Sequence, residues 1–419
     1  MKMNNTQKSV YFWNMVGNLA AATVSVLYLL IVSRFSNAKT ADDFSMAYAI
    51  GNLWVVIGLF QVRNYQGTDI KETHSFAAYL LARSYSLTLM VATILPYLLL
   101  TQYQSSYELV LLVILYRVGD VISDLFQGFF QQRDRLDIAG KNMTIRYTTS
   151  TLVLAFSLAI GKHLPLALAL MATTNLALVF LLDCRQAQKL YTTKLHALFR
   201  KSLHKDAYTI LRACFPLFIN GFLLTYIFNE PKQVIETGLA EGSLVTGMQR
   251  DFSILFMPVF FMSLCVLILR PLITSLARLW YQHSYQEFRQ ICNRLVLSLF
   301  IGGSLISLLA FGIGTPILSL LFGIDLTSHN LTLGILVFSG ILYSLAIVFE
   351  NLITIFRQQK ILVFVYLLLF IFSRIITSPL IFHYQLLGAA ISFLLTMTIY
   401  ALVMGLLTIY LYSKGKKNV

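Results

Sequence analysis

The chain has 419 residues, of which 57% are hydrophobic and only 12% are charged, and its mean hydropathy is +0.72. Soluble domains do not carry this much apolar side chain, so the composition indicates a polytopic helical membrane protein and excludes an ordinary soluble enzyme. The formal net charge of +14 does not indicate nucleic-acid binding. Membrane topology and attraction to anionic lipid account for most of it.

Apolar runs long enough to cross about 30 Å of hydrocarbon as helices recur along the whole chain. We predict twelve transmembrane helices at approximately residues 11–33, 43–62, 75–100, 108–130, 141–161, 164–184, 208–229, 249–270, 293–313, 331–356, 361–381 and 385–412. The first run has no small-residue cleavage site and a second span follows at once, so we expect a span rather than a cleavable signal. The longest breaks, 185–207, 230–248 and 271–292, leave no room for a soluble domain.

The distribution of Lys and Arg predicts that both termini are cytoplasmic. With that orientation, most basic residues lie in cytoplasmic segments, including 185–207 and the tail 414–417. The few on the other side are Arg34, Lys39, Lys162, Lys232 and Arg250.

The most unusual span is LVLLVILYRVGDVISDLFQGFF, residues 109–130, because it carries Arg117, Asp120 and Asp124. Each charge costs roughly 2.5–3.5 kcal/mol at the bilayer centre. Positions three and four apart share one helix face, so the three side chains should face protein or a polar cavity rather than lipid. Two interpretations remain open: a binding site, and an Arg117–Asp120 ion pair that only holds helices together.

Other arginines also lie inside predicted spans, namely Arg83, Arg146, Arg212 and Arg374. Arg212 is close enough to the basic segment to extend to the membrane interface. The remaining three are candidates for a functional site.

Weak internal similarity indicates a duplication. RYTTS at 146–150 and RIITS at 374–378 share a pattern at an offset of 228, and LY…QQ at 115–132 recurs at 342–359 at an offset of 227. We therefore predict an N-terminal six-helix bundle at 1–184, a basic cytoplasmic linker at 185–207, and a C-terminal six-helix bundle at 208–419. Both repeats start from the cytoplasm, so the pseudo-twofold axis should lie along the membrane normal.

Several motifs resemble a known group of transporters. YFWNMVGNLAAATVSVLYLLIVSRF, RNYQGTD at 63–69, FQGFFQQRDRLDIAGK at 126–141 and YQLLGAAISF at 384–393 are similar to the Wzx-like polysaccharide and teichoic-acid repeat-unit flippases. These form a branch of the multidrug/oligosaccharidyl-lipid/polysaccharide (MOP) exporter superfamily. The resemblance implies two pseudo-symmetric bundles around a central cavity, as in the MATE multidrug exporters of the superfamily, and alternating access. The acidic residue that those exporters commonly carry in span one is missing here.

The resemblance also implies a substrate, undecaprenyl pyrophosphate carrying an oligosaccharide, and a bacterial plasma membrane. Arg holds phosphate bidentately and keeps its charge, so Arg83, Arg117, Arg146 and Arg374 are the predicted phosphate ligands. Asn14 and its repeat counterpart Asn220 are candidates for sugar contacts, although amides also join helices. We expect a monomer in a bilayer with anionic lipids, alongside a polymerase and glycosyltransferases of the same pathway.

The acidic residues are candidates for coupling or gating. Asp120 could hold Arg117 between transport events, whereas Asp124 and Glu350 lie nearer the cytoplasmic end of their spans. Proton coupling, sodium coupling and simple gating pairs all remain open. Arg63, Gln66 and Asp69, with Arg270 in the second half, are candidates for receiving the headgroup at the cytoplasmic face, or form a solvated loop cluster.

The alternatives are a MATE-type small-molecule exporter and, less favoured, a membrane polysaccharide polymerase. A polymerase usually needs a large external loop, and the longest external break here, 230–248, contains a single Lys. No DxD-like, HExxH, GxSxG or nucleotide-binding motif is present, so we predict no catalytic residue, metal or cofactor.

Overall fold

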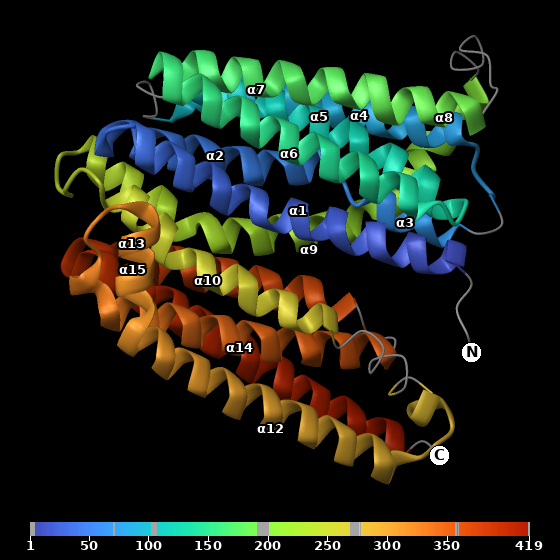
Figure 1. The fold of residues 1–419 in the computed structure, drawn as a ribbon. Helices are drawn as coiled ribbons and strands as arrows, with labels where there is room; N and C mark the ends of the chain where they lie inside the picture. Colours follow the sequence, from blue (N-terminus) through green and yellow to red (C-terminus); the bar gives the residue numbers. More distant parts are fainter. Residues whose placement is uncertain are drawn as a thin grey trace. The chain divides into compact units, whose positions relative to one another are not determined.

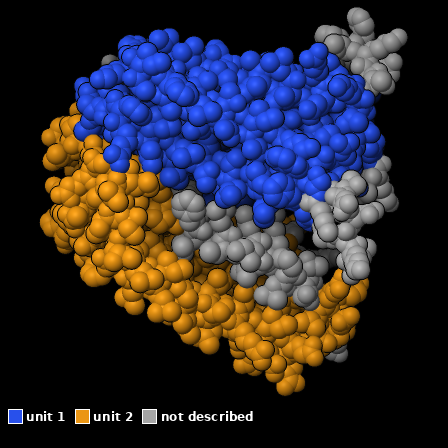
Figure 2. Space-filling view, viewed as in Figure 1, with its two compact units in different colours: residues 1–225 blue, residues 226–419 orange. Residues whose placement is uncertain are grey.

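The computed structural model describes residues 5–69, 72–101, 107–190, 201–268, 276, 278–356, 358 and 360–417. Within these ranges every regular element is a helix, which confirms the all-α prediction (Figure 1). The chain forms two compact units, Met1–Thr225 (unit 1) and Tyr226–Val419 (unit 2) (Figure 2). The division into bundles at 1–184 and 208–419 stays a prediction from the repeats.

Unit 1 contains α1 (Asn5–Phe35), α2 (Ala38–Leu59), α3 (Val62–Thr68), α4 (Phe76–Leu100), α5 (Tyr107–Gln132), α6 (Leu136–Gly161), α7 (Leu164–Leu178), the π-helical turn η2 (Val179–Cys184), α8 (Arg185–Leu190) and the first part of α9 (Lys201–Ala240). Short polar side chains cap the N-termini of α2 and α4: the Asn37 side chain accepts from Thr40 N, and Ser75 Oγ accepts from Ala78 N. Lys162 ends α6 in the left-handed conformation.

Helix α5 is the centre of unit 1, because it packs against α2, α4, α6 and α7. The charged face of α5 is therefore enclosed by neighbouring helices: Arg117 and Asp120 are both buried. For these two charges the expectation that the face meets protein is confirmed, and Asp124 is partly buried.

Helices α1 and α6 approach most closely at two glycines. A Cβ added at Gly140 would lie 2.0 Å from the carbonyl oxygen of Trp13, and one added at Gly17 would lie 2.7 Å from the Gly140 backbone. Only glycine permits this approach of two backbones, the packing that small residues provide in membrane helices.

Unit 2 contains the end of α9, then α10 (Met248–Ile268), α12 (Tyr285–Leu309), the π-helical turn η4 (Ala310–Gly314), α13 (Thr315–Phe322), the short 3₁₀ turn η5 (Thr327–His329), α14 (Asn330–Ile355) and α15 (Lys360–Lys417). Its central helix is α14, which packs against α10, α12 and α15. Helix α15 comprises two helices joined at Gln385, whose φ of 53° and ψ of −129° are non-helical.

Among the described residues, eight helices are long and apolar enough to cross a membrane, and the one at Lys360–Lys414 includes two predicted spans. The other predicted spans correspond to α2, α5 and α10. One predicted boundary is wrong. The external break expected at 230–248 is helical to Ala240, because α9 continues through Pro231 and buries Glu230 and Lys232 inside unit 2.

Candidate functional site

A carboxylate shared by two arginines lies at the middle of α5. The Asp120 cluster consists of Asn52, Arg117, Asp120, Arg146 and Asn175. Arg117 Nη1 donates to Asp120 Oδ2 over 2.7 Å, and Arg146 Nη1 donates to Asp120 Oδ1 over 2.6 Å. The predicted pairing of Arg117 with Asp120 is confirmed, but Arg146 from α6 completes it. One negative charge thus holds two positive charges.

Amides and aromatic rings fix both guanidinium groups. Arg117 Nη2 donates to Asn52 on α2, and Arg146 Nη1 donates to Asn175 Oδ1 on α7 over 2.8 Å. Asn175 in turn donates to the backbone oxygen of Tyr116 over 2.8 Å. Each guanidinium carbon also lies over an aromatic ring, Arg117 at 4.7 Å from the centroid of Tyr48 and Arg146 at 4.4 Å from that of Tyr147, which favours the cationic form.

The two arginines differ in accessibility. The Arg146 residue is 1% exposed and the Arg117 residue is 9% exposed. Arg146 is therefore enclosed by protein, whereas part of Arg117 reaches the surface of unit 1.

A second shared carboxylate lies one turn further along α5. The Asp124 cluster consists of Arg63, Arg83, Asp124 and Gln127. Arg83 Nη2 donates to Asp124 Oδ2 over 2.6 Å, and Arg63 Nη1 lies 3.5 Å from Asp124 Oδ1 and donates to Gln127 Oε1 over 2.5 Å. Arg83 Nη1 also donates to the backbone oxygens of Gly58 and Leu59, each over 2.7 Å. These carbonyls end α2 and have no partner within the helix, so the cation satisfies them.

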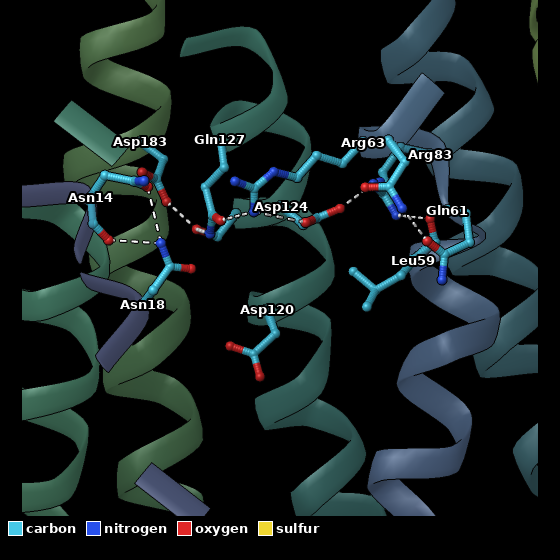
Figure 3. Close-up of polar contacts among 12 residues, drawn as sticks. Asn14, Asn18, Leu59, Gln61, Arg63, Arg83, Asp120, Asp124, Gln127 and Asp183 are labelled. Atoms are coloured by element: carbon cyan, nitrogen blue, oxygen red, sulfur yellow. Dashed lines mark hydrogen bonds and ion pairs between the residues drawn. The ribbon is translucent and has the colours of Figure 1, made fainter. Parts of the chain in front are cut away.

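Hydrogen bonds extend the Asp124 cluster across unit 1 to a buried acid on η2 (Figure 3). Gln127 Nε2 donates to Ser123 Oγ over 3.2 Å, and Ser123 Oγ donates to Asp183 Oδ2 over 2.7 Å. Asn142 Nδ2 on α6 donates to Asp183 Oδ1 over 2.7 Å. Polar side chains from five elements, α3, α4, α5, α6 and η2, are thereby connected.

The predicted entry residues lie close to this cluster. Gln66 is fully buried and donates to Gln132 Oε1 over 3.2 Å, and Gln132 donates to the backbone oxygen of Asp69 over 3.1 Å. The carboxylate of Asp69 accepts from Thr73 N, Thr73 Oγ1, His74 N and the hydroxyl of Tyr79. Asp69 therefore organises the loop between α3 and α4 rather than standing free in it. Arg270 lies outside the described residues.

This arrangement predicts an acid-sensitive loop. Burial acts to raise the pKa of Asp69, but the hydrogen bonds from Thr73, His74 and Tyr79 outweigh it and lower the pKa to about 2. A depressed pKa gives stability above the ordinary carboxyl pKa of about 3.9, and that stability is lost as the pH falls toward 2. Thermal unfolding of the Asp69→Asn variant should thus lie below wild type at neutral pH and converge with it in acid. Parallel curves at all pH values would contradict this.

In unit 2 the predicted residues lie in two separate places. Glu350 on α14 accepts from Tyr366 and Tyr400, at 2.8 and 3.0 Å, and makes no ion pair with a described residue. Arg374 has a side chain that is 53% exposed and donates to the buried Glu230 over 2.9 Å. Arg374 is therefore on the surface of unit 2, tied to α9.

The two asparagines differ in their hydrogen bonds, and their equivalence stays a prediction from the repeats. Asn14 accepts from Asn18 Nδ2 through both its backbone and side-chain oxygens, at 2.7 and 3.0 Å (Figure 3). Asn220 Oδ1 is buried without a hydrogen-bond partner in the described part of the chain. No common sugar-binding geometry is evident from these contacts.

Several residues of the clusters were not predicted. Asn52, Asn175 and Asp183 hold or extend the charge network, and Glu230 anchors Arg374. Each had a signal in the sequence, because an amide or acid inside or at the end of an apolar run needs a polar partner. Glu230 lies in the segment 230–248 that was expected to be an external break.

Comparison with solved structures identifies the class of fold. The chain is similar to the Vibrio cholerae MATE transporter VcmN in its bent form (TM-score 0.53, 13% identity, covering 99% of this chain and 97% of that one). It is similar to a MOP superfamily transporter from Pyrococcus furiosus (0.55, 13%, 99% and 97%) and to the eukaryotic MATE transporter AtDTX14 (0.60, 12%, 99% and 100%). The chain therefore has the fold of the MATE transporters.

A relative at the sequence level is more specific. The chain is 24% identical over 402 residues to the capsular polysaccharide biosynthesis protein CapF of Staphylococcus aureus, covering 95% of this chain and 97% of CapF. No family model matches the chain. The chain is thus similar in sequence to a capsular polysaccharide biosynthesis protein and in fold to MATE transporters, as the resemblance implied.

Proposed function

We propose that this protein is a flippase that moves undecaprenyl-pyrophosphate-linked oligosaccharide repeat units of a capsule-like polysaccharide from the inner to the outer leaflet. The two bundles would expose the site alternately to the two sides of a bacterial plasma membrane. The MATE fold and the similarity to CapF support the transporter class and the polysaccharide pathway.

The observation that carries the proposal is the ratio of charges inside unit 1. Asp120 is shared by Arg117 and Arg146, and Asp124 by Arg63 and Arg83. Even with Asp183, which hydrogen bonds connect to the Asp124 cluster, these four arginines outnumber the three acids by one positive charge. A pyrophosphate headgroup is anionic, and guanidinium groups are its best partners in a low-dielectric environment. A cationic drug would be repelled by the same clusters, which disfavours the small-molecule exporter.

An unused donor supports the same conclusion. Arg117 Nε is buried without a hydrogen-bond partner in the described part of the chain. A buried N–H group without an acceptor is costly, so a phosphate oxygen that reached Arg117 would be favoured there.

The difference in exposure supports different roles for the two arginines of the Asp120 cluster. Arg117, which is partly accessible, contacts the pyrophosphate, whereas Arg146, which is enclosed, keeps Asp120 in place. Outward movement of the anionic headgroup is favoured by an inside-negative potential, by about 2.3 kcal/mol per charge per 100 mV. Coupling to a proton or sodium ion at Asp120, Asp124 or Glu350 is not required for this electrical driving force.

The test is flipping of a fluorescent undecaprenyl-pyrophosphate oligosaccharide in proteoliposomes. Arg117→Ala should reduce the rate about tenfold or more, because a bidentate phosphate contact is lost. Arg117→Lys should recover only part of the rate, because a single ammonium cannot form two parallel hydrogen bonds.

Arg135→Ala is the matched control, because Arg135 is exposed and pairs only with Asp137 among the described residues. It should flip at the wild-type rate. Wild-type flipping by Arg117→Ala, or uptake of cationic dyes in place of the glycolipid, would contradict the proposed substrate.

A further inference from the structure

Unit 2 contains a groove with a volume of about 830 Å³ that lies outside both charge clusters. It is bounded by the first half of α12, the end of α14 and the end of α15. Its walls include Phe288, Phe300 and Phe349 with Leu297 and Leu352, so most of its surface is apolar. The volume is in the range of ordinary ligand sites.

The polar residues of this groove are not equivalent. Thr408, Tyr412 and Ser413 on α15 donate their hydroxyls to backbone oxygens of the protein. Arg289 and Asn293 on α12 line the groove, and neither forms an ion pair or hydrogen bond with a described residue. These two side chains are one turn apart on the same helix face, so both are available to one ligand.

The residues that line the groove change from polar to apolar along α12. Arg289 and Asn293 come first, followed on the same face by Val296, Leu297 and Phe300. From Arg289 to Phe300 the helix rises about 16 Å, at about 1.5 Å per residue. That length is close to one leaflet of hydrocarbon, about 15 Å. The polar end matches a lipid headgroup. The apolar wall, about one leaflet long, matches an acyl chain that lies along the membrane normal.

We propose that this groove binds an anionic glycerophospholipid, with its phosphate on Arg289 and Asn293 and an acyl chain along Leu297 and Phe300. Charge selects the occupant, because the one charged residue lining the groove is a cation and no described acid neutralises it. With the predicted topology, the start of α12 and the end of α15 are at the cytoplasmic face, so the lipid belongs to the inner leaflet, where basic pockets between helices bind acidic headgroups. This site is independent of the proposed flippase activity.

The test is native mass spectrometry of the full-length protein released from detergent containing equal amounts of phosphatidylglycerol and phosphatidylcholine. The wild-type protein should retain phosphatidylglycerol preferentially. Arg289→Ala should weaken phosphatidylglycerol binding about tenfold, because the charge-assisted phosphate contact is lost. Leu297→Trp should weaken it too, because the indole fills the apolar end without changing charge.

Arg294→Ala is the control, because Arg294 is exposed on the same helix but does not line the groove. It should retain the lipid as wild type does. Equal losses in Arg289→Ala and Arg294→Ala would show general surface attraction and overturn the site. Equal retention of phosphatidylcholine, no effect of Leu297→Trp, or displacement by undecaprenyl phosphate would each overturn the proposed occupant. Arg289, Leu297 and Arg294 are all exposed, so the three variants should unfold at the same temperature as wild type. Thermal unfolding therefore verifies that each variant is folded.

Discussion

Asp120→Asn is expected to leave substrate binding intact or tighter while slowing flipping by about tenfold or more. The carboxylate holds Arg117 at 2.7 Å and Arg146 at 2.6 Å, so in the proposed mechanism it competes with the substrate phosphate for Arg117. A neutral amide competes poorly, and the substrate stays bound. Binding and flipping of the labelled glycolipid should be measured on the same preparation.

The same variant should also be less stable. Removing one partner of a buried ion pair leaves uncompensated charge and costs about 3–5 kcal/mol. Asp120→Asn should therefore unfold at a clearly lower temperature, whereas Asp137→Asn, which alters a partly exposed pair with Arg135, should change little. If Asp120→Asn abolished binding in protein that is still folded, Asp120 would belong to the substrate site itself and the release mechanism would be wrong.

Asp124→Asn should instead alter gating or ion dependence.

Gly140→Ala is expected to have the largest effect of any single methyl group in unit 1. The added Cβ would lie 2.0 Å from Trp13 O and 2.8 Å from Asn14 N, and both are backbone atoms that no side-chain rotation can move. Helix α1 would have to separate from α6, at a cost of about 1–3 kcal/mol or more. The measurement is thermal unfolding in detergent together with flipping activity.

Gly161→Ala is the control on the same helix, because nothing lies within 4 Å of a Cβ there. It should match or slightly exceed wild-type stability, since Ala favours a helix over Gly. Comparable losses in the two variants would mean that helix propensity, rather than the α1–α6 contact, sets the effect.

More of the fold than of the candidate site could be predicted from the sequence. Span positions followed from apolar runs, and the burial of Arg117 and Asp120 followed from their spacing, because helix periodicity is local. The partners of these residues lie on α2 and α6, and no local pattern indicates which side chain meets which guanidinium. The end of α9 was placed too early, because the charged residues Glu230 and Lys232 interrupt the apolar run but are buried by tertiary packing in a helix that continues to Ala240.

The crowding of charge on α5 also bears on how the chain enters the membrane. Helix α5 is not among those apolar enough to qualify alone as a span, because Arg117, Asp120 and Asp124 inside it oppose transfer into lipid. Its polar partners on other helices lie both before it, on α2, α3 and α4, and after it, on α6. A translocon that releases helices one at a time would deliver α5 into lipid before Arg146 existed to pair with Asp120. We therefore expect α5 to stay at the translocon until α6 has been synthesised, so that the two helices enter the membrane together.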